Sequence, residues 1–249
     1  MLVFAMSDRR DTGQTGQWLD SDGQRWWFDS GSVALDFAYS GSMGDTPAWE
    51  KLHTADDLAD WLNARFSGVV PETGAAASVS ASASAAEALP GTTTLGSATS
   101  VSAPLGSAMS ATDRDLLDAK ALRDAIASLT SSAAARTSLN TRDIDVLNLF
   151  AATPDIPPSL GGGSRQAGRT APRAGQALST LARTAIELFD PLEIERIREC
   201  SADDCGIIYL DTSRSANRRW CSMQRCGNRA KIRAYRERLA QQNSETAGF

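Results

Sequence analysis

All four cysteines of this 249-residue chain fall within one short window. They are Cys200, Cys205, Cys221 and Cys226, and their spacing is C-x4-C-x15-C-x4-C. Two close pairs of thiols separated by a short spacer are typical of a structural zinc site, because Zn2+ takes four thiolate ligands at the corners of a tetrahedron. The spacing therefore predicts one structural Zn2+ bound by these four side chains.

Two disulfides, with three possible pairings, are the alternative interpretation of the four cysteines. Disulfides belong to oxidising compartments, and the opening apolar run, residues 1–6, is too short for a signal peptide and has no basic flank. No apolar run approaches the roughly 20 residues of a membrane span. We therefore expect reduced cysteines in a cytoplasmic protein with no membrane partner. The single histidine, His53, is expected to be a surface residue rather than a ligand.

The residues between the cysteines predict a compact ββα unit. Residues 207–210 are β-prone, 211–217 are rich in turn formers, and 218–221 can return as the second strand, which would bring Cys205 and Cys221 together. A helix is expected to open at 226–228. Because so small a unit has little core, metal binding would supply much of its folding free energy.

Charge is distributed unevenly along the chain. The net charge is −5, and residues 1–164 alone stand at −10, whereas residues 165–249 stand at +5. The segment 213–240 holds nine Lys and Arg residues and the single acid Glu237. An acidic body with a basic C-terminal segment favours a polyanionic partner, although a solvated helix face is the alternative.

The expected C-terminal helix carries three arginines on one face, because they lie at i, i+4 and i+7. They are Arg229, Arg233 and Arg236. A second stripe on this helix is expected to pack on the hairpin and leave the arginines pointing outward. It consists of Ile232, Tyr235 and Leu239.

A helix fits the major groove of DNA, where Arg can bond bidentately to guanine, and the remaining cations would neutralise phosphates. Asn228 is assigned to a helix cap or knuckle, with a contact to adenine as the alternative. The expected nucleic-acid contacts are Arg214, Arg218, Arg219, Arg225, Arg229, Lys231, Arg233 and Arg236.

Ahead of the cysteines, hydrophobic periodicity predicts mainly helices. Short apolar stretches at 24–28 and 32–38 favour a strand followed by a second strand or a helix start. Helices are expected from caps at Thr54, Thr112 and Asn140, and a further helix over 177–189. Residues 73–111 are almost entirely Ala, Ser, Thr and Gly, so they cannot bury enough apolar area to offset their ordering entropy, and they predict a flexible insertion.

Nothing in the sequence favours an enzyme. Four thiolates close the coordination sphere of zinc and leave no open position for water or substrate. There is no G-x-S-x-G, no P-loop and no G-x-G-x-x-G after a strand, and the glycines at 161–163 are assigned to a linker. Four tryptophans of the N-terminal half are assigned to the core, with an effector pocket as the alternative. They are Trp26, Trp27, Trp49 and Trp61.

The segment 220–231, W-C-S-M-Q-R-C-G-N-R-A-K, resembles the signature of the CGNR zinc finger family, and residues 200–214 match the rest of that module. The N-terminal part resembles the ABATE domain that accompanies this finger in bacterial proteins. The matching pieces are residues 35–38, 57–61, 122–126 and 178–186. The chain departs from the family in its long Ala/Ser insertion and in having Tyr39-Ser40 where the family has Asn-Thr. The resemblance implies a stress-related transcription regulator with a largely helical N-terminal domain.

Together these observations predict a mainly α (α+β) protein with four parts. They are a flexible N-terminus at 1–24, a helical domain with a small β-hairpin contribution at 25–190 that the insertion at 73–111 interrupts, a ββα-like four-cysteine zinc finger at 196–240, and a flexible tail at 241–249. The predicted function is a nucleoid-associated, zinc-dependent regulator that binds double-stranded DNA, with an N-terminal domain for sensing a small-molecule effector or for homodimerisation. The alternative is a zinc-stabilised module that binds protein or RNA.

Overall fold

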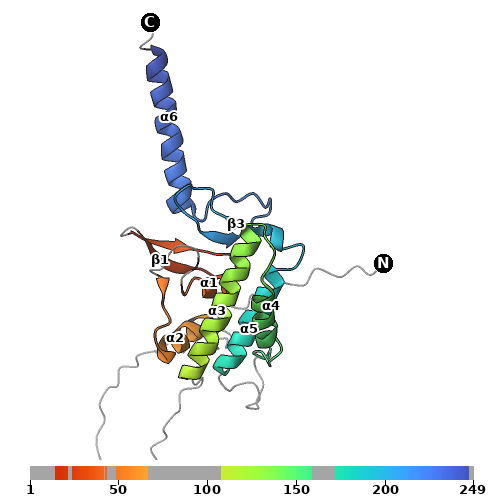
Figure 1. Cartoon of the computed structure of the whole chain (residues 1–249). Helices are drawn as coiled ribbons and strands as arrows, with labels where there is room; N and C mark the ends of the chain where they lie inside the picture. Colours follow the sequence, from red (N-terminus) through yellow and green to blue (C-terminus); the bar gives the residue numbers. More distant parts are fainter. Residues whose placement is uncertain are drawn as a thin grey trace, which may run out of the picture.

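The computed structural model describes residues 15–21, 24–41, 43, 49–66, 108–158 and 172–246. Most of the insertion expected at 73–111 and the glycines at 161–163 lie outside these ranges. The elements in chain order are β1 (Gln17–Ser21), β2 (Gln24–Phe28), α1 (Val33–Ala38), α2 (Ala55–Phe66), α3 (Asp113–Ala134), α4 (Thr141–Ala151), α5 (Ala174–Leu188), η3 (Ile194–Arg196), β3 (Ile197–Glu199), β4 (Ile208–Leu210), η4 (Met223–Gly227) and α6 (Asn228–Thr246). The mainly α, α+β class is confirmed (Figure 1).

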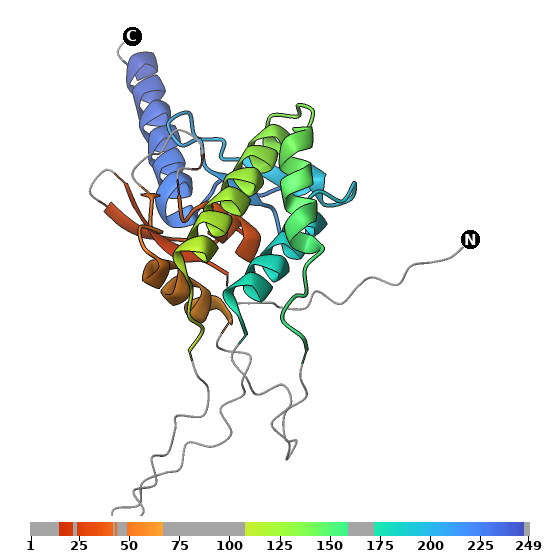
Figure 2. The same ribbon diagram turned by 60° about the horizontal axis from the view of Figure 1, so that its bottom comes forward.

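The body of the molecule is a group of helices packed around α1. Helices α3, α4 and α5 lie side by side, and α1 packs against α3 and α5 with all six of its residues buried (Figure 2). Leu35, Leu122 and Leu181 are fully excluded from solvent where these helices meet. Among the described residues, no helix is both long and apolar enough to cross a membrane.

The predicted helix starts at Thr54, Thr112 and Asn140 are confirmed. The Thr112 hydroxyl accepts a hydrogen bond from the Asp115 N–H, and the Asp115 carboxylate accepts one from the Thr112 N–H at 2.8 Å. Thr54 and Asp57 make the same reciprocal pair. Asn140 accepts a hydrogen bond from the backbone of α4 at 2.9 Å. Each cap satisfies amide groups that a helix start leaves without partners.

The first strand falls inside residues 1–24, for which we expected a loose N-terminus. Strands β1 and β2 pair antiparallel in a register that places Leu19 opposite Trp26. Leu19 and Phe28 are buried in the core, so the hairpin covers the body with one apolar face, and this burial orders the segment. The stretch 32–38, left open between strand and helix, forms α1 with Ser32 as its cap.

The far end of the expected insertion is also packed. Met109 is only 4% exposed, its N–H donates to Asn63 Oδ1, and its carbonyl accepts from Asn63 Nδ2, both at 2.8 Å. Packing against α2 therefore includes a residue of the expected insertion, because Met109 supplies a buried apolar side chain.

The four tryptophans assigned to the core do not behave alike. Trp26 and Trp49 are core residues, as expected, and Trp49 Nε1 donates to the Asp20 carbonyl at 2.9 Å. Trp61 is half-buried against Phe37. Trp27 is 40% exposed on the outer face of the hairpin, so its assignment to the core is wrong. His53 is exposed, as expected.

The second hairpin corrects the predicted strand pairing of the finger. Strand β4 pairs antiparallel with β3, so Ile208 faces Glu199, and residues 218–221 do not form a strand. The reason is that the 218–221 backbone is engaged elsewhere: the Arg218 N–H donates to Asp211 Oδ2, and the Arg219 carbonyl accepts from the Ser201 N–H. The finger keeps two strands and a helix, but its first strand precedes Cys200.

Candidate metal centre and nucleic-acid interface

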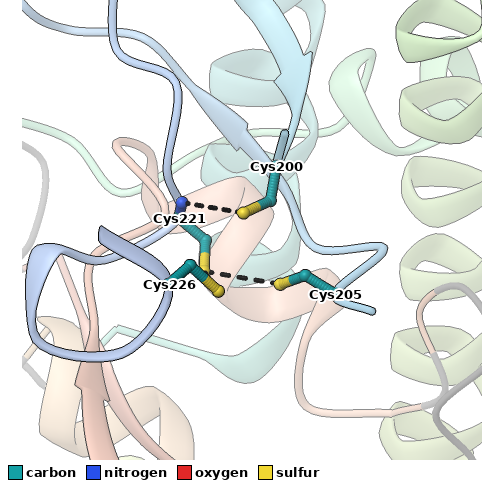
Figure 3. Close-up of side chains that lie close together, drawn as sticks. All are labelled: Cys200, Cys205, Cys221 and Cys226. Carbon is teal, nitrogen blue, oxygen red and sulfur yellow. Dashed lines mark hydrogen bonds between the residues drawn. The ribbon is translucent and has the colours of Figure 1, made fainter. Parts of the chain in front are cut away.

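The four cysteine sulfurs meet at one point although they come from four separate pieces of chain (Figure 3). Cys200 follows β3, Cys205 precedes β4, Cys221 lies in the extended segment before η4, and Cys226 lies within η4. All four Sγ atoms lie within 4.8 Å of one another. The sulfur of Cys221 is 3.6 Å from that of Cys205 and 3.5 Å from that of Cys226.

These distances fit a tetrahedral metal site and not a pair of disulfides. A zinc–sulfur bond of about 2.3 Å places the corners of the tetrahedron about 3.8 Å apart, close to the spacing observed here. A disulfide requires about 2.05 Å between sulfurs, and all four cysteines are free. Three are buried and Cys205 is half-buried, so the donor set is closed and suits a soft, structural ion such as Zn2+.

The loops around the sulfurs have local reasons for their shape. Gly206, directly after Cys205, has φ of +60°, a conformation that residues with a Cβ rarely adopt. The turn returns the chain so that the Cys200 N–H can donate to the Ile207 carbonyl at 2.8 Å. Ser222 caps η4 by accepting from the Gln224 N–H, which fixes the tight turn that presents Cys226.

The pKa values of the clustered thiols also indicate that a cation is needed to ionise them together. Hydrogen bonds from the Cys205 and Cys221 thiols, aided by the Cys221 N–H, lower the pKa of Cys200 to about 2. Because the Cys205 and Cys221 thiols donate hydrogen bonds to the Cys200 thiolate, they hold their own protons more tightly. The pKa of Cys205 rises to about 12, and the pKa of Cys221 rises as well. Cys200, Cys205 and Cys221 cannot all be thiolates at this separation without a positive ion among them, because thiolates this close raise one another's pKa.

The Cys226 sulfur has one cationic neighbour from the helix that follows it. Arg229 Nη2 lies 3.3 Å from Cys226 Sγ, and this hydrogen bond raises the pKa of the Arg229 guanidinium. A positive charge at this distance stabilises a thiolate ligand. The first turn of α6 is therefore tied to the cysteine cluster.

The finger is anchored on the helical body through β4. The Tyr39 hydroxyl accepts from the Ile208 N–H at 2.8 Å and donates to the Ile208 carbonyl at 2.9 Å. The Leu210 N–H donates to the Ser30 carbonyl at 2.8 Å. Gly31 permits this approach, because a Cβ there would lie 2.6 Å from the Leu210 carbonyl oxygen. The finger and the N-terminal domain thus share hydrogen bonds across their junction.

Asp211 and Arg218 form a second anchor that sequence reasoning missed. Burial favours the neutral form of Asp211, but hydrogen bonds from Ser213 and from the Arg218 N–H outweigh it and hold the pKa below its usual value. The Arg218 guanidinium donates to the carbonyls of Trp220, Cys221 and Asp29, and it lies 4.2 Å from the centre of the Tyr209 ring. Arg218, predicted to contact nucleic acid, therefore points inward and braces the metal loop.

Helix α6 projects away from the body (Figure 1). Every side chain from Lys231 to Asn243 is exposed. We expected Ile232, Tyr235 and Leu239 to pack on the hairpin, but they are 51%, 57% and 40% exposed. The correction has a geometric cause: α6 leaves the finger at its root, so it meets the rest of the molecule through its first two turns, by way of Arg229 and Arg233.

The arginines of α6 are not all free, in contrast to our expectation. Arg229 Nη1 lies 2.8 Å from Asp204 Oδ2, and Arg233 Nη1 lies 3.0 Å from Asp203 Oδ2. These acids lie between the first two cysteines, in the sequence C-S-A-D-D-C. Two adjacent acids in the same zinc module as a basic helix were the sequence signal that could have predicted these ion pairs. Arg236 and Lys231 are exposed on α6.

The remaining predicted contacts lie in the loops of the finger and in η4. Arg214 is exposed in the turn after β4. Arg219 stacks on Trp220 and Arg225 stacks on Trp26, at 5.1 and 5.2 Å from the ring centres. Asn228 starts α6, and its Nδ2 lies 3.5 Å from the Gln224 carbonyl, which agrees with a role in the knuckle.

Two family models match the chain. The model described as "CGNR zinc finger" matches residues 196–239. The ABATE model, described as "Putative stress-induced transcription regulator", matches residues 31–190. No curated protein matches the chain.

Proposed function

The chain belongs to the ABATE family and ends in a CGNR zinc finger, and from this premise we propose that it is a zinc-dependent regulator of transcription that binds double-stranded DNA through α6. In this proposal Cys200, Cys205, Cys221 and Cys226 hold one Zn2+. The ion supplies folding free energy rather than chemistry, because four thiolates leave no open coordination position.

The projecting basic helix rooted in the cysteine cluster is the observation that carries this proposal. An α-helix with its side chains is about 10–12 Å across, which matches the width of the major groove. Arg233, Arg236 and Lys231 lie on the part of α6 that is exposed all round. They can reach base edges or phosphates without moving any packed element, although Arg233 must give up its exposed ion pair with Asp203 to do so.

The other basic residues would contribute to DNA binding to different extents. Arg229 approaches DNA only at the expense of its contact with Asp204, while it keeps its contact with Cys226. Arg214, Arg219 and Arg225, in the loops of the finger and in η4, contact phosphates. Arg218 has its donors engaged within the protein and acts as a brace, so it is withdrawn from the set of DNA contacts.

The second candidate is a protein- or RNA-interaction module, and the exposed stripe Ile232, Tyr235 and Leu239 favours it. Apolar side chains recurring at this spacing on an exposed helix suit a groove on a protein partner. The excess of arginine on the same helix favours a polyanion and places DNA first.

The N-terminal domain would sense an effector or form a dimer. A homodimer would double the short sequence that a lone finger can read, about 3 base pairs. This role places the protein in the cytoplasm, on the nucleoid.

The test uses the full chain loaded with zinc and a fluorescent 30-base-pair duplex of random sequence. Arg233→Gln with Arg236→Gln is expected to abolish most of the binding, because it removes two of the proposed DNA contacts. The zinc site should stay intact, because neither residue touches a cysteine sulfur. Arg114→Gln with Arg173→Gln removes the same charge from the start of α3 and the residue before α5, and is expected to bind as wild type does. Equal binding by wild type and the α6 variant would contradict the proposal, and preference for single-stranded RNA would favour the second candidate.

A further inference from the structure

A shallow polar hollow of about 380 Å³ lies beside the finger. None of the four cysteines and no described residue of α6 lines it. Its lining comes from both domains: Arg136 follows α3, Arg198 and Glu199 lie on β3, and Arg219 precedes Cys221. Arginine is the commonest residue type in this lining, with four arginines against the two acids Glu195 and Glu199. Clustered guanidinium groups on an open polar surface suit phosphate oxygens, which they can bind bidentately.

The hollow is continuous with the arginine face of α6. Ser201 borders this hollow and also the small depression that Arg229 and Arg233 line. The Ser201 N–H donates to the Arg219 carbonyl at 2.9 Å, so the two surfaces meet on one rigid strip of backbone. The hollow therefore adjoins, across Ser201, the surface that a ligand bound to Arg229 and Arg233 would cover.

Two arginines of the hollow are available to an incoming anion. Arg198 is 43% exposed, and its ion pair with the buried Asp211 is long, at 3.9 Å, so its guanidinium can also bind an anion from solvent. Arg219 is exposed, and within the described part of the chain no carboxylate lies within ion-pair distance of it. Arg136, by contrast, is paired with Glu195 at 3.1 Å.

The hollow also lies on the side of the molecule where DNA bound to α6 would lie. The C-terminal end of α3 and strand β3 lie at the end of the body from which α6 projects, and α3 begins at the opposite end (Figure 1). The start of α3 carries the acids Asp113, Asp115 and Asp118. These acids therefore lie at the far end of α3 from the hollow and do not oppose a polyanion that meets Arg198 and Arg219.

We propose that Arg198 and Arg219 hold the phosphodiester backbone of the same duplex that α6 enters, so that the DNA footprint extends from the finger onto the N-terminal domain. This inference rests on the proposed function. It assigns a positioning role to residues outside the helix: they set the angle of α6 in the groove while reading no bases.

The test compares the salt dependence of affinity for a random 30-base-pair duplex. Each phosphate contact contributes roughly 0.9 to the slope of log K against log salt. Arg198→Gln with Arg219→Gln is expected to lower the slope by about two and to weaken binding by about tenfold near 0.1 M salt. Arg198→Lys with Arg219→Lys retains both charges and is expected to keep the wild-type slope. Arg114→Gln with Arg173→Gln is the charge-matched control.

The outcomes separate the two proposals. If the wild type binds and the Gln pair keeps the same slope and affinity, the extended footprint is wrong and the α6 proposal stands. If zinc-loaded wild type binds no duplex, the proposed function fails and this inference fails with it. Inorganic phosphate or tripolyphosphate that binds the wild type without competing with the duplex would assign the hollow to a free anion and also overturn the inference.

Discussion

The Tyr39 hydroxyl satisfies both backbone groups of Ile208, accepting from its N–H at 2.8 Å and donating to its carbonyl at 2.9 Å. Tyr39 directly follows α1 at the centre of the body, and Ile208 begins the strand beside Cys205. A single buried side chain therefore joins the core of the N-terminal domain to the loop that carries a proposed zinc ligand. We therefore expect the finger and the body to unfold as one cooperative structure.

Removing that hydroxyl should destabilise both parts together. Tyr39→Phe leaves a buried N–H and a buried carbonyl without partners, and we expect it to lower the free energy of unfolding by about 2–4 kcal/mol in urea titrations of the zinc-loaded protein. Tyr235→Phe removes an exposed hydroxyl on α6 and serves as the control. A change below about 0.5 kcal/mol for Tyr39→Phe would show that the junction contributes little.

The acids beside α6 should weaken DNA binding. Asp204 and Asp203 neutralise Arg229 and Arg233 in the free protein and would lie near phosphates in a complex. Asp203→Asn with Asp204→Asn is expected to tighten duplex binding by about tenfold at low salt, and less at high salt because the charges are exposed.

The matched control for this effect is Asp56→Asn with Asp60→Asn, two exposed acids on α2. It changes the net charge equally at a distance from the finger, so it should alter affinity little. If both double variants tighten binding to the same extent, the effect belongs to net charge and the local contacts have no special role.

The metal content should be one Zn2+ per chain. X-ray absorption of the reduced protein is expected to give four sulfur neighbours at about 2.3 Å. Cys205→Ser should lower the zinc affinity strongly and release the finger from a defined fold, because a hydroxyl is a poor ligand for this ion. An absence of stoichiometric zinc, or oxygen and nitrogen neighbours in its coordination shell, would contradict the assignment of the four cysteines.

Asp36 should make stability depend on pH in an unusual direction. Burial raises its pKa from 3.8 to about 6, in spite of hydrogen bonds from Ser30 Oγ and the Gly16 N–H. Because the folded state holds this proton more tightly than the unfolded state, the contribution to stability is fully present below about pH 4 and is lost as the pH rises to about 6. The rise in pKa corresponds to roughly 3 kcal/mol.

The measurement is the free energy of unfolding of wild type minus that of Asp36→Asn across this range. The variant cannot titrate at position 36, and its zinc site is the same, so the difference isolates this carboxyl group. We expect the difference to fall between pH 4 and 6.5 and to be constant above that. A constant difference throughout would mean that Asp36 titrates as an exposed aspartate does.

Local sequence signals predicted much of this structure. Thr54, Thr112 and Asn140 each cap a helix because capping depends only on residues within one turn. The cysteine spacing predicted the gathering of the four sulfurs for a related reason, since metal-site geometry restricts which loop lengths can close it.

Contacts between distant segments could not be predicted in this way. Ile208 pairs with Glu199 and not with the Arg218 segment, because strand pairing depends on competition among remote partners that periodicity does not record. Periodicity also predicts the apolar stripe of α6, but it does not predict which surface, if any, packs against that stripe. Ile232 is exposed because α6 passes beyond the edge of the body.

The central claim joins metal binding to DNA binding, and one measurement tests it most directly. Duplex affinity of the full chain is measured as purified with zinc, after chelation under reducing conditions, and after zinc is restored. We expect tight, salt-dependent binding with zinc, a loss of at least about tenfold without it, and recovery on its return. Equal affinity in all three states would contradict the account, because α6 would then bind DNA without the cysteine cluster that holds it.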